Sequence, residues 1–109
     1  MTNPWPAVRK QGALWQGEVV SVDPSGNAVT NLRASEVRPL AKTSKMWIEF
    51  EKSAATVRGI SDTLAGSEPG KLIALEGPGG FVVLAVNQGN AADLIPIAVG
   101  DRVNVHFRA

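Results

Sequence analysis

The sequence predicts an all-β, antiparallel, barrel-like domain of about seven strands, with at most one or two short helical turns. Short apolar runs recur along the chain, separated by Gly, Pro, Asn and Asp, which is typical of β-sandwiches and barrels. The 109 residues are enough for a single domain with its own core. We expect this domain over residues 13–109, preceded by an extended N-terminal arm over residues 1–12, where Pro4 and Pro6 disfavour regular structure.

The first half of the chain contains four strand-like runs: residues 14–22, 27–33, 46–50 and 55–60. A turn is expected at residues 23–26, because Pro24 presets its backbone angle and Gly26 tolerates a positive φ. The last two runs form a plausible hairpin. Residues 34–40 are ambiguous, and a short helical turn fits them.

In the second half, residues 71–76 and 81–86 flank a glycine-rich turn and form the clearest hairpin of the chain. Its second arm is apolar at nearly every position, so we expect both of its faces to be covered, one by the core and the other by a partner or another layer. The remaining segments are a surface loop at 62–70, one helical turn near 90–94 and a closing strand at 102–107.

Composition disfavours several classes of function. The net charge is +1 and the charges are dispersed, so no basic field is available for nucleic acid or an anionic membrane. No apolar run is long enough to span a bilayer, and the N-terminus has no export signal. Together with the absence of cysteine, this predicts a cytoplasmic protein. Without cysteines or clustered carboxylates, the lone His106 cannot build a metal site, so neither a metal nor a catalytic base is expected.

Aromatic side chains offer a second type of candidate site. Trp5, Trp15 and Trp47 could form a stacking platform for a planar ligand. Core or interface packing is the favoured interpretation, because aromatic side chains dominate the energetics of both environments.

Two asparagine-centred turns are the most informative motifs. One follows the first strand, over residues 23–31, and the other follows the hairpin, over residues 87–92. Each places short amides and glycine-freed backbone at a strand end, where a small polar ligand could be bound. Neither motif contains a nucleophile, a metal cluster or a general base.

These motifs carry a family resemblance. The stretch from Gly17 to Asn31 resembles the pattern G-x-V-x-x-x-D-x-x-G-N-x-x-T-N, and residues 80–92 are similar to G-Y-L-E-I-A-V-N-Q-G-N-A-A. Both patterns belong to the C-terminal domain of the S-adenosylmethionine hydroxide adenosyltransferase and fluorinase family. In that family the catalytic Asp, Arg and His belong to a larger N-terminal domain. The resemblance therefore implies no catalytic residues in this chain.

The resemblance also implies a set of ligand-binding residues: Asp23, Ser25, Asn27, Gly79, Val86, Asn87 and Gln88. Asn27 would lie beside the adenosyl group, and Asp23 would contact the ribose or the methionine. The alternative is structural, because Asx side chains often satisfy their own turn. In the same way, Gly79 could serve only a hairpin turn, and Asn87 only a strand-to-helix corner.

Two positions depart from the family pattern. Ser25 stands where the family usually has an aromatic residue that covers the adenine. Pro78 stands in a hairpin turn that typically reads N-S-x-G, and it supplies neither a hydroxyl nor a backbone donor. Both changes remove potential ligand contacts.

Three functions remain open. The first is a non-catalytic module that binds S-adenosylmethionine or adenosine, with no other cofactor. The second is a subunit that completes an adenosyltransferase active site with a separate N-terminal-type chain, where water or halide would attack the adenosyl C5′. The third is a structural or oligomerisation domain that has lost its ligand. We expect self-association through the apolar hairpin at residues 82–86, with a trimer favoured by the resemblance.

Overall fold

The computed structural model describes residues 7–43, 45–52, 55–61, 70–86 and 97–108. Its elements, in chain order, are β1 (Arg9–Gln11), β2 (Leu14–Val22), β3 (Ala28–Arg33), α1 (Ala34–Thr43), β4 (Lys45–Phe50), β5 (Thr56–Arg58), β6 (Leu72–Glu76), the 3₁₀ turn η1 (Pro78–Gly80), β7 (Phe81–Val86) and β8 (Arg102–Arg108).

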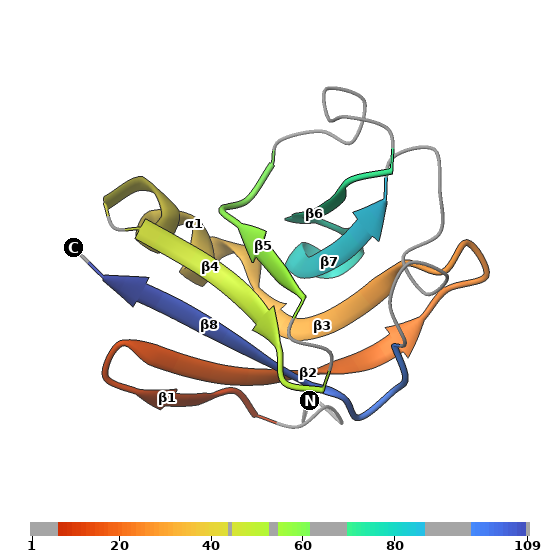
Figure 1. Ribbon diagram of the computed structural model, residues 1–109, viewed down its shortest axis with the longest axis horizontal. Helices are drawn as coiled ribbons and strands as arrows, with labels where there is room; N and C mark the ends of the chain where they lie inside the picture. Colours follow the sequence, from red (N-terminus) through yellow and green to blue (C-terminus); the bar gives the residue numbers. More distant parts are fainter. Residues whose placement is uncertain (1–6, 44, 53–54, 62–69, 87–96, 109) are drawn as a thin grey trace.

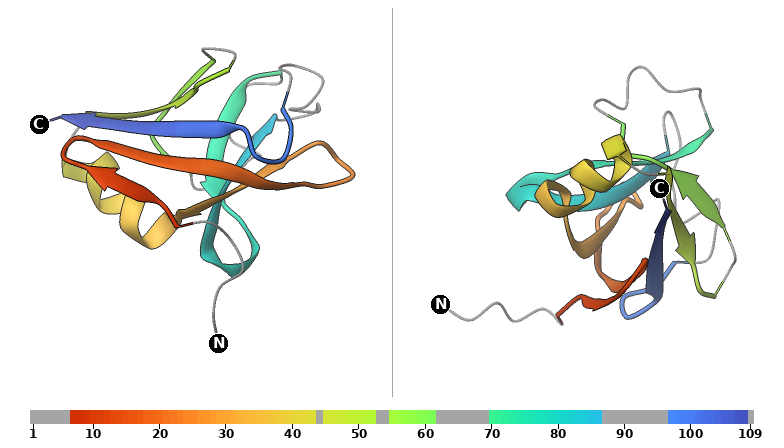
Figure 2. Two further views of the ribbon diagram at one scale, coloured as in Figure 1. Left: turned by 90° about the horizontal axis from the view of Figure 1, so that it is seen from below. Right: turned by 90° about the vertical axis from the view of Figure 1, so that its left-hand side faces the viewer.

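Seven strands form one antiparallel sheet in the order β5-β4-β8-β2-β3-β7-β6, and β1 pairs with β2 beside this path. The sheet curls so that its two edge strands approach each other (Figures 1 and 2). Just after β5, the backbone N–H of Ser61 donates to the carbonyl of Ala74 at 2.7 Å, and Ser61 forms an isolated parallel bridge with Leu75 of β6. This contact nearly closes the sheet, which confirms the predicted all-β, barrel-like class.

The strands follow the predicted apolar runs closely. β2 and β7 have the predicted bounds, and β3, β4, β6 and β8 differ from prediction by one residue at an end. β5 is shorter than its predicted run, and Arg9–Gln11 of the predicted arm forms strand β1. The predicted loop at 62–69 and the predicted helical turn at 90–94 lie outside the described residues.

The ambiguous segment after β3 is a helix of ten residues, which extends to Thr43. Its buried residues Ala34 and Val37 and its half-buried Leu40 share one face at helical spacing and pack on the core. Glu36 in the first turn and Lys42 in the last complement the helix dipole. Tertiary burial of this face outweighs the low helix propensity of the internal Pro39.

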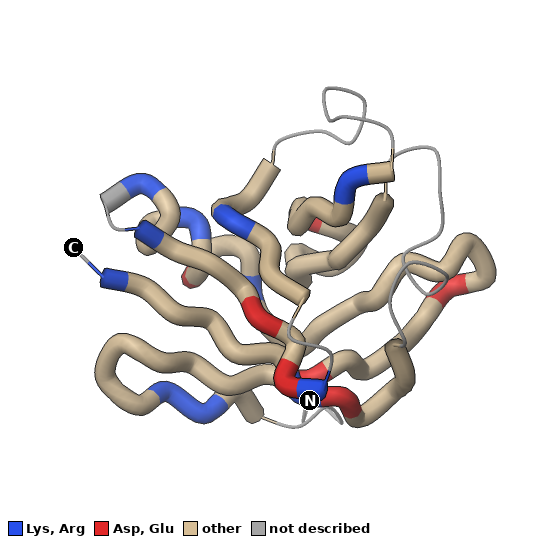
Figure 3. Tube along the Cα trace, in the orientation of Figure 1, with Lys and Arg blue, Asp and Glu red and all other residues tan. Residues whose placement is uncertain are grey.

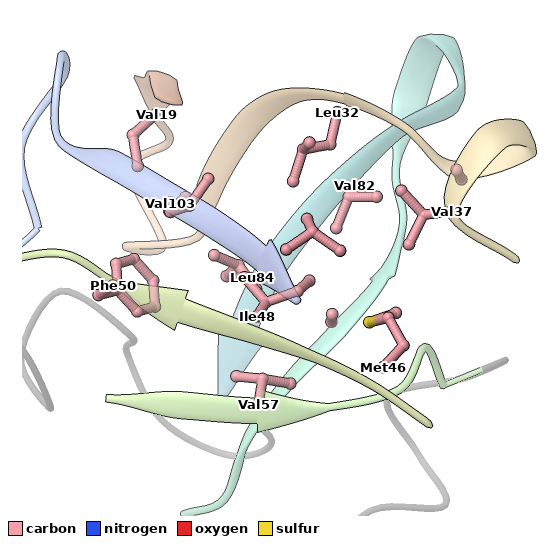
Figure 4. Packing of buried hydrophobic residues seen from close by; sticks show 14 residues of the cluster. Val19, Leu32, Val37, Met46, Ile48, Phe50, Val57, Val82, Leu84 and Val103 are labelled. Carbon is pink, nitrogen blue, oxygen red and sulfur yellow. The ribbon is translucent and has the colours of Figure 1, made fainter. Parts of the chain in front are cut away.

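The core fills the interior of the curled sheet. Inward residues alternate with outward ones, as in β4, where Met46, Ile48 and Phe50 are buried. Figure 4 shows labelled residues of this cluster converging from both halves of the sheet and from α1: Val19, Leu32, Val37, Met46, Ile48, Phe50, Val57, Val82, Leu84 and Val103.

β7 is the most buried strand of the barrel. Val82 and Leu84 face the core, while Val83, Ala85 and Val86 are 6%, 2% and 5% exposed in the single chain. Both faces are therefore covered, as predicted, but without a second molecule. The hairpin consequently does not present the exposed apolar surface from which self-association was expected.

Among the described residues, no helix is long and apolar enough to cross a membrane; α1 has only ten residues.

Candidate functional site

The turn between β2 and β3 is held by four hydrogen bonds that link Asp23 with Gly26 and Asn27. The backbone N–H of Gly26 donates to the carbonyl of Asp23 at 2.8 Å, and the N–H of Asp23 donates to the carbonyl of Asn27 at 3.0 Å. The Asp23 carboxylate accepts from the Asn27 backbone N–H at 2.9 Å and from the Asn27 side-chain amide at 3.2 Å. Gly26 has a φ of 83°, which confirms the glycine requirement predicted for this turn.

These bonds fix the orientation of the Asn27 amide. An ionised carboxylate can only accept hydrogen bonds, so the nitrogen of the amide must face Asp23. One amide hydrogen and the Oδ1 oxygen of Asn27 then make no bond to any described residue. Asn27 is half-buried and keeps one donor and one acceptor side by side, which is the pattern that complements the edge of an adenine.

Asp23 and Ser25 have different surroundings in the same turn. Both oxygens of the Asp23 carboxylate are engaged with Asn27, so within this structure the side chain serves the turn. Ser25 is exposed at the tip beside Pro24. Its hydroxyl offers no apolar surface, so it cannot cover a base as an aromatic residue would.

Val86 lies near this turn, whereas Gly79 does not. Ala28 pairs with Leu84, so the antiparallel register carries the turn preceding Ala28 toward the end of β7 at Val86. Gly79 belongs to the hairpin turn at the opposite end of β7. At about 3.3 Å per residue, the six residues of β7 separate the two turns by roughly 15–20 Å. Asn87 and Gln88 lie outside the described residues.

The hairpin turn around Gly79 has a complete structural explanation. The N–H of Gly77 donates to the carbonyl of Phe81 at 2.8 Å, and the N–H of Gly80 donates to Gly77 at 3.1 Å. Gly79 and Gly80 have φ values of 76° and 83°, which side chains rarely tolerate. A Cβ on Gly77 would lie 2.3 Å from a methyl of Val83, so this glycine is required by packing.

Thr30 and Asn31 of the first motif make side-chain hydrogen bonds where the regular pairing of β3 with its neighbouring strands is interrupted or ends. The Thr30 hydroxyl donates to the carbonyl of Val82 at 2.7 Å and accepts from the N–H of Leu32 at 3.3 Å. The Asn31 side-chain oxygen accepts from the N–H of Glu18 at 2.8 Å. Both residues are buried. Both residues belong to the family pattern but were not among the predicted site residues, and their structural role follows only from the irregular register of β3.

Two of the three tryptophans pack against rings on β8. Trp15 meets Phe107 edge-on at 5.4 Å, and Trp47 stacks on His106 at 5.1 Å. Both indole rings are therefore packed against β8, although Trp47 is only half-buried and also lines a surface hollow; Trp5 lies outside the described residues. The Nε2 atom of His106 is 3.4 Å from Oε1 of Glu49.

Two surface hollows are formed by described residues, and neither is lined by Asp23, Asn27, Gly79 or Val86. One has a volume of about 560 Å³ and lies over β4, β5 and the end of β8. The other, of about 310 Å³, lies beside β2 around Gly17 and Glu18. Among the residues that the structure describes, no group of three or more His, Cys, Asp or Glu side chains is placed to hold a metal ion.

Comparisons with known proteins agree with the motifs. Residues 17–104 match the family model of the SAM hydroxide adenosyltransferase C-terminal domain. The (R)-S-adenosyl-L-methionine hydrolase of Salinispora tropica is 32% identical over 102 residues, which cover 94% of this chain and 36% of the hydrolase. The chain thus spans about a third of the length of this relative.

Solved structures show the same fold. An uncharacterized conserved protein from Thermotoga maritima superposes with a TM-score of 0.80 at 19% identity, over 97% of this chain and 41% of that one. A conserved hypothetical protein from Thermus thermophilus gives a TM-score of 0.63 at 27% identity, over 83% and 34%. With the family model covering most of the barrel, this chain belongs to the family of the SAM hydroxide adenosyltransferase C-terminal domain.

Proposed function

We propose that this domain is a non-catalytic module that binds the adenosyl group of S-adenosylmethionine or adenosine, with Asn27 as its principal ligand contact. The observation that supports this most directly is the Asn27 amide, held by Asp23 with one donor and one acceptor unused by the described residues. A pre-oriented amide loses little conformational entropy on binding, so its hydrogen bonds contribute more to affinity.

Asp23 acts in this proposal as a positioning residue. Its carboxylate holds the Asn27 amide nitrogen and the turn backbone at once, and a direct contact to ribose or methionine would compete with these bonds. Val86, at the end of β7, would approach the ligand, and Asn87 and Gln88 stay proposed contacts because of the family resemblance. Gly79 is the least suited of the predicted residues, because it lies at the other end of that strand.

A second candidate function is supported by the length of the hydrolase relative. The matched segment is only 36% of that protein, and both oxygens of the Asp23 carboxylate at the turn are engaged by Asn27. In this alternative the domain closes an active site whose catalytic residues lie on a further segment or another chain. Water would attack the adenosyl C5′ there, methionine would leave, and this domain would hold the nucleoside.

Calorimetric titration with adenosine and with S-adenosylmethionine tests the primary proposal. We expect saturable binding that the Asn27→Ala variant weakens roughly tenfold, as for the loss of one or two directed hydrogen bonds. Asn104→Ala is the matched control, since Asn104 is a half-buried asparagine on β8 that bonds Gln16 instead. An absence of heat at millimolar ligand would reject an autonomous binding module and favour the partner-dependent alternative.

Assembly and localisation remain parts of the proposal. A homo-oligomer, with a trimer suggested by the resemblance, or a complex with a catalytic chain would both suit a domain that supplies only part of a site. Because the β7 hairpin is covered within one chain, the contact surface would lie elsewhere. Sedimentation at tens of micromolar distinguishes a monomer from these assemblies.

We also propose that the protein is located in the cytoplasm.

A further inference from the structure

Three basic side chains line the hollow of about 560 Å³ at the end of the barrel where β4 begins and β8 ends. They are Lys45, Arg58 and Arg108, and each is exposed. Figure 3 shows the start of β4, the end of β8 and the neighbouring part of β5 as basic segments on one side of the molecule. Among the residues that the structure describes, none of those that line this hollow is acidic.

These charges are placed against one another by the strand register. Lys45 and Arg108 are direct cross-strand partners, and like charges in this position are destabilising. Elsewhere in the described chain, basic residues such as Lys10 and Arg38 reach a carboxylate. Within the same described residues, no ion pair forms at Lys45, Arg58 or Arg108. The hollow thus concentrates uncompensated positive charge, which attracts anions.

An aromatic wall lies beside the basic residues. Trp47 is the cross-strand partner of Arg58 on one side and of His106 on the other. The His106 ring stacks on Trp47 at 5.1 Å with an interplanar angle of 7°, which fixes the indole next to the hollow. Met46 and Ala41 add further apolar lining. If an anionic ligand binds here, the part of it that carries no charge can therefore pack against Trp47 or the apolar side chains.

We propose that this hollow binds a small phosphate ester, with its phosphate oxygens on Arg58, Arg108 and Lys45 and its planar body against Trp47. Guanidinium groups match phosphate oxygens through paired N–H donors, and lysine adds a point charge. The site is separate from the turn at Asn27. The nine residues of β2 run from Leu14, opposite His106, to Val22 before that turn, a span of roughly 25 Å.

Titration with pyrophosphate and with uridine diphosphate tests this site, because neither probe contains an adenosyl group. We expect saturable binding of both that weakens as salt is raised. Arg58→Gln and Arg108→Gln should each weaken binding about fivefold or more, as for the loss of a charge-assisted hydrogen bond. Lys71→Gln, which removes an exposed charge outside the hollow, should change it less than twofold.

The aromatic wall has its own test. We expect uridine diphosphate to bind several-fold tighter than pyrophosphate, and Trp47→Leu to remove most of this difference while leaving pyrophosphate binding in place. The proposal is overturned if neither probe saturates at millimolar concentration. It is also overturned if Lys71→Gln weakens binding as much as the arginine variants, or if the two probes bind equally to the unmodified chain.

Discussion

The side-chain oxygen of Asn31 accepts a hydrogen bond from the backbone N–H of Glu18 at 2.8 Å, just beyond Val19 and Thr30, the last regular pair of β2 with β3. Gly17 precedes Glu18, and a Cβ built on Gly17 would lie 2.6 Å from the same Asn31 oxygen. The glycine that opens the motif and the asparagine that ends it are therefore a structural pair. This explains their presence without any ligand.

Gly17→Ala should destabilise the domain by about 1–3 kcal/mol, because its methyl overlaps the Asn31 oxygen and approaches Leu32 at 3.0 Å. The free energy of unfolding from urea denaturation measures this effect. Ser21→Ala, an exposed position on the same strand, should be nearly neutral. If Gly17→Ala has the same free energy of unfolding as the unmodified chain, the new methyl group and the Asn31 oxygen must move apart without cost, which would contradict this prediction.

Asn31→Ala should also cost about 1–3 kcal/mol, since the N–H of Glu18 loses its acceptor at a part-buried site. The double variant with Gly17→Ala is expected to be more stable than the sum of the two losses predicts. Removing the amide frees the space that the new methyl needs, so the coupling should reach about 0.5–3 kcal/mol. Strict additivity in the urea midpoints would contradict the pairing.

Thr30→Val should lower the free energy of unfolding by about 1–3 kcal/mol although it conserves shape. The valine methyl would face the carbonyl of Val82 and the N–H of Leu32, both of which bond the buried Thr30 hydroxyl. Thr30→Ser keeps the hydroxyl and loses only a methyl group, so it serves as the comparison. We expect the serine variant to be the more stable of the two in thermal and urea unfolding.

The strands were predictable because each one is a local pattern. Alternation of buried and exposed residues in β4, and the Asp-Pro-Ser-Gly turn after β2, depend on neighbours in sequence. Helix α1 was less predictable, because Pro39 argues against a helix and the compensating burial of Val37 arises from tertiary packing.

The candidate sites were even harder to predict from the sequence, because they depend on contacts between residues that are not sequence neighbours or that no motif specifies. The motif pointed to Asn27, but the role of Asp23 in orienting it follows from two hydrogen bonds that no sequence pattern specifies. The basic hollow was not predicted at all, since Lys45, Arg58 and Arg108 are scattered along the chain and meet only through strand register. Gly79 was grouped with Asn27 by family motif, although the length of β7 keeps them apart.

Asp23→Ala should weaken adenosine binding nearly as much as Asn27→Ala, if Asp23 acts by holding the Asn27 amide. The variant should also lose about 1–2 kcal/mol of stability, because two hydrogen bonds of the turn disappear. Asp23→Asn is the sharper test. An asparagine can still accept from the backbone N–H of Asn27, but one of its two polar atoms is then a donor rather than an acceptor.

With a donor in place of the carboxylate oxygen, the Asn27 amide is expected to flip and to present its donor and acceptor in exchanged positions. Adenosine affinity should then fall while stability falls less than in Asp23→Ala. Calorimetry and urea unfolding on the same three variants separate these effects. Loss of stability in Asp23→Ala with unchanged affinity would assign Asp23 to the turn alone. Equal affinity in Asp23→Asn and the unmodified chain would mean that the orientation of the Asn27 amide does not govern ligand binding.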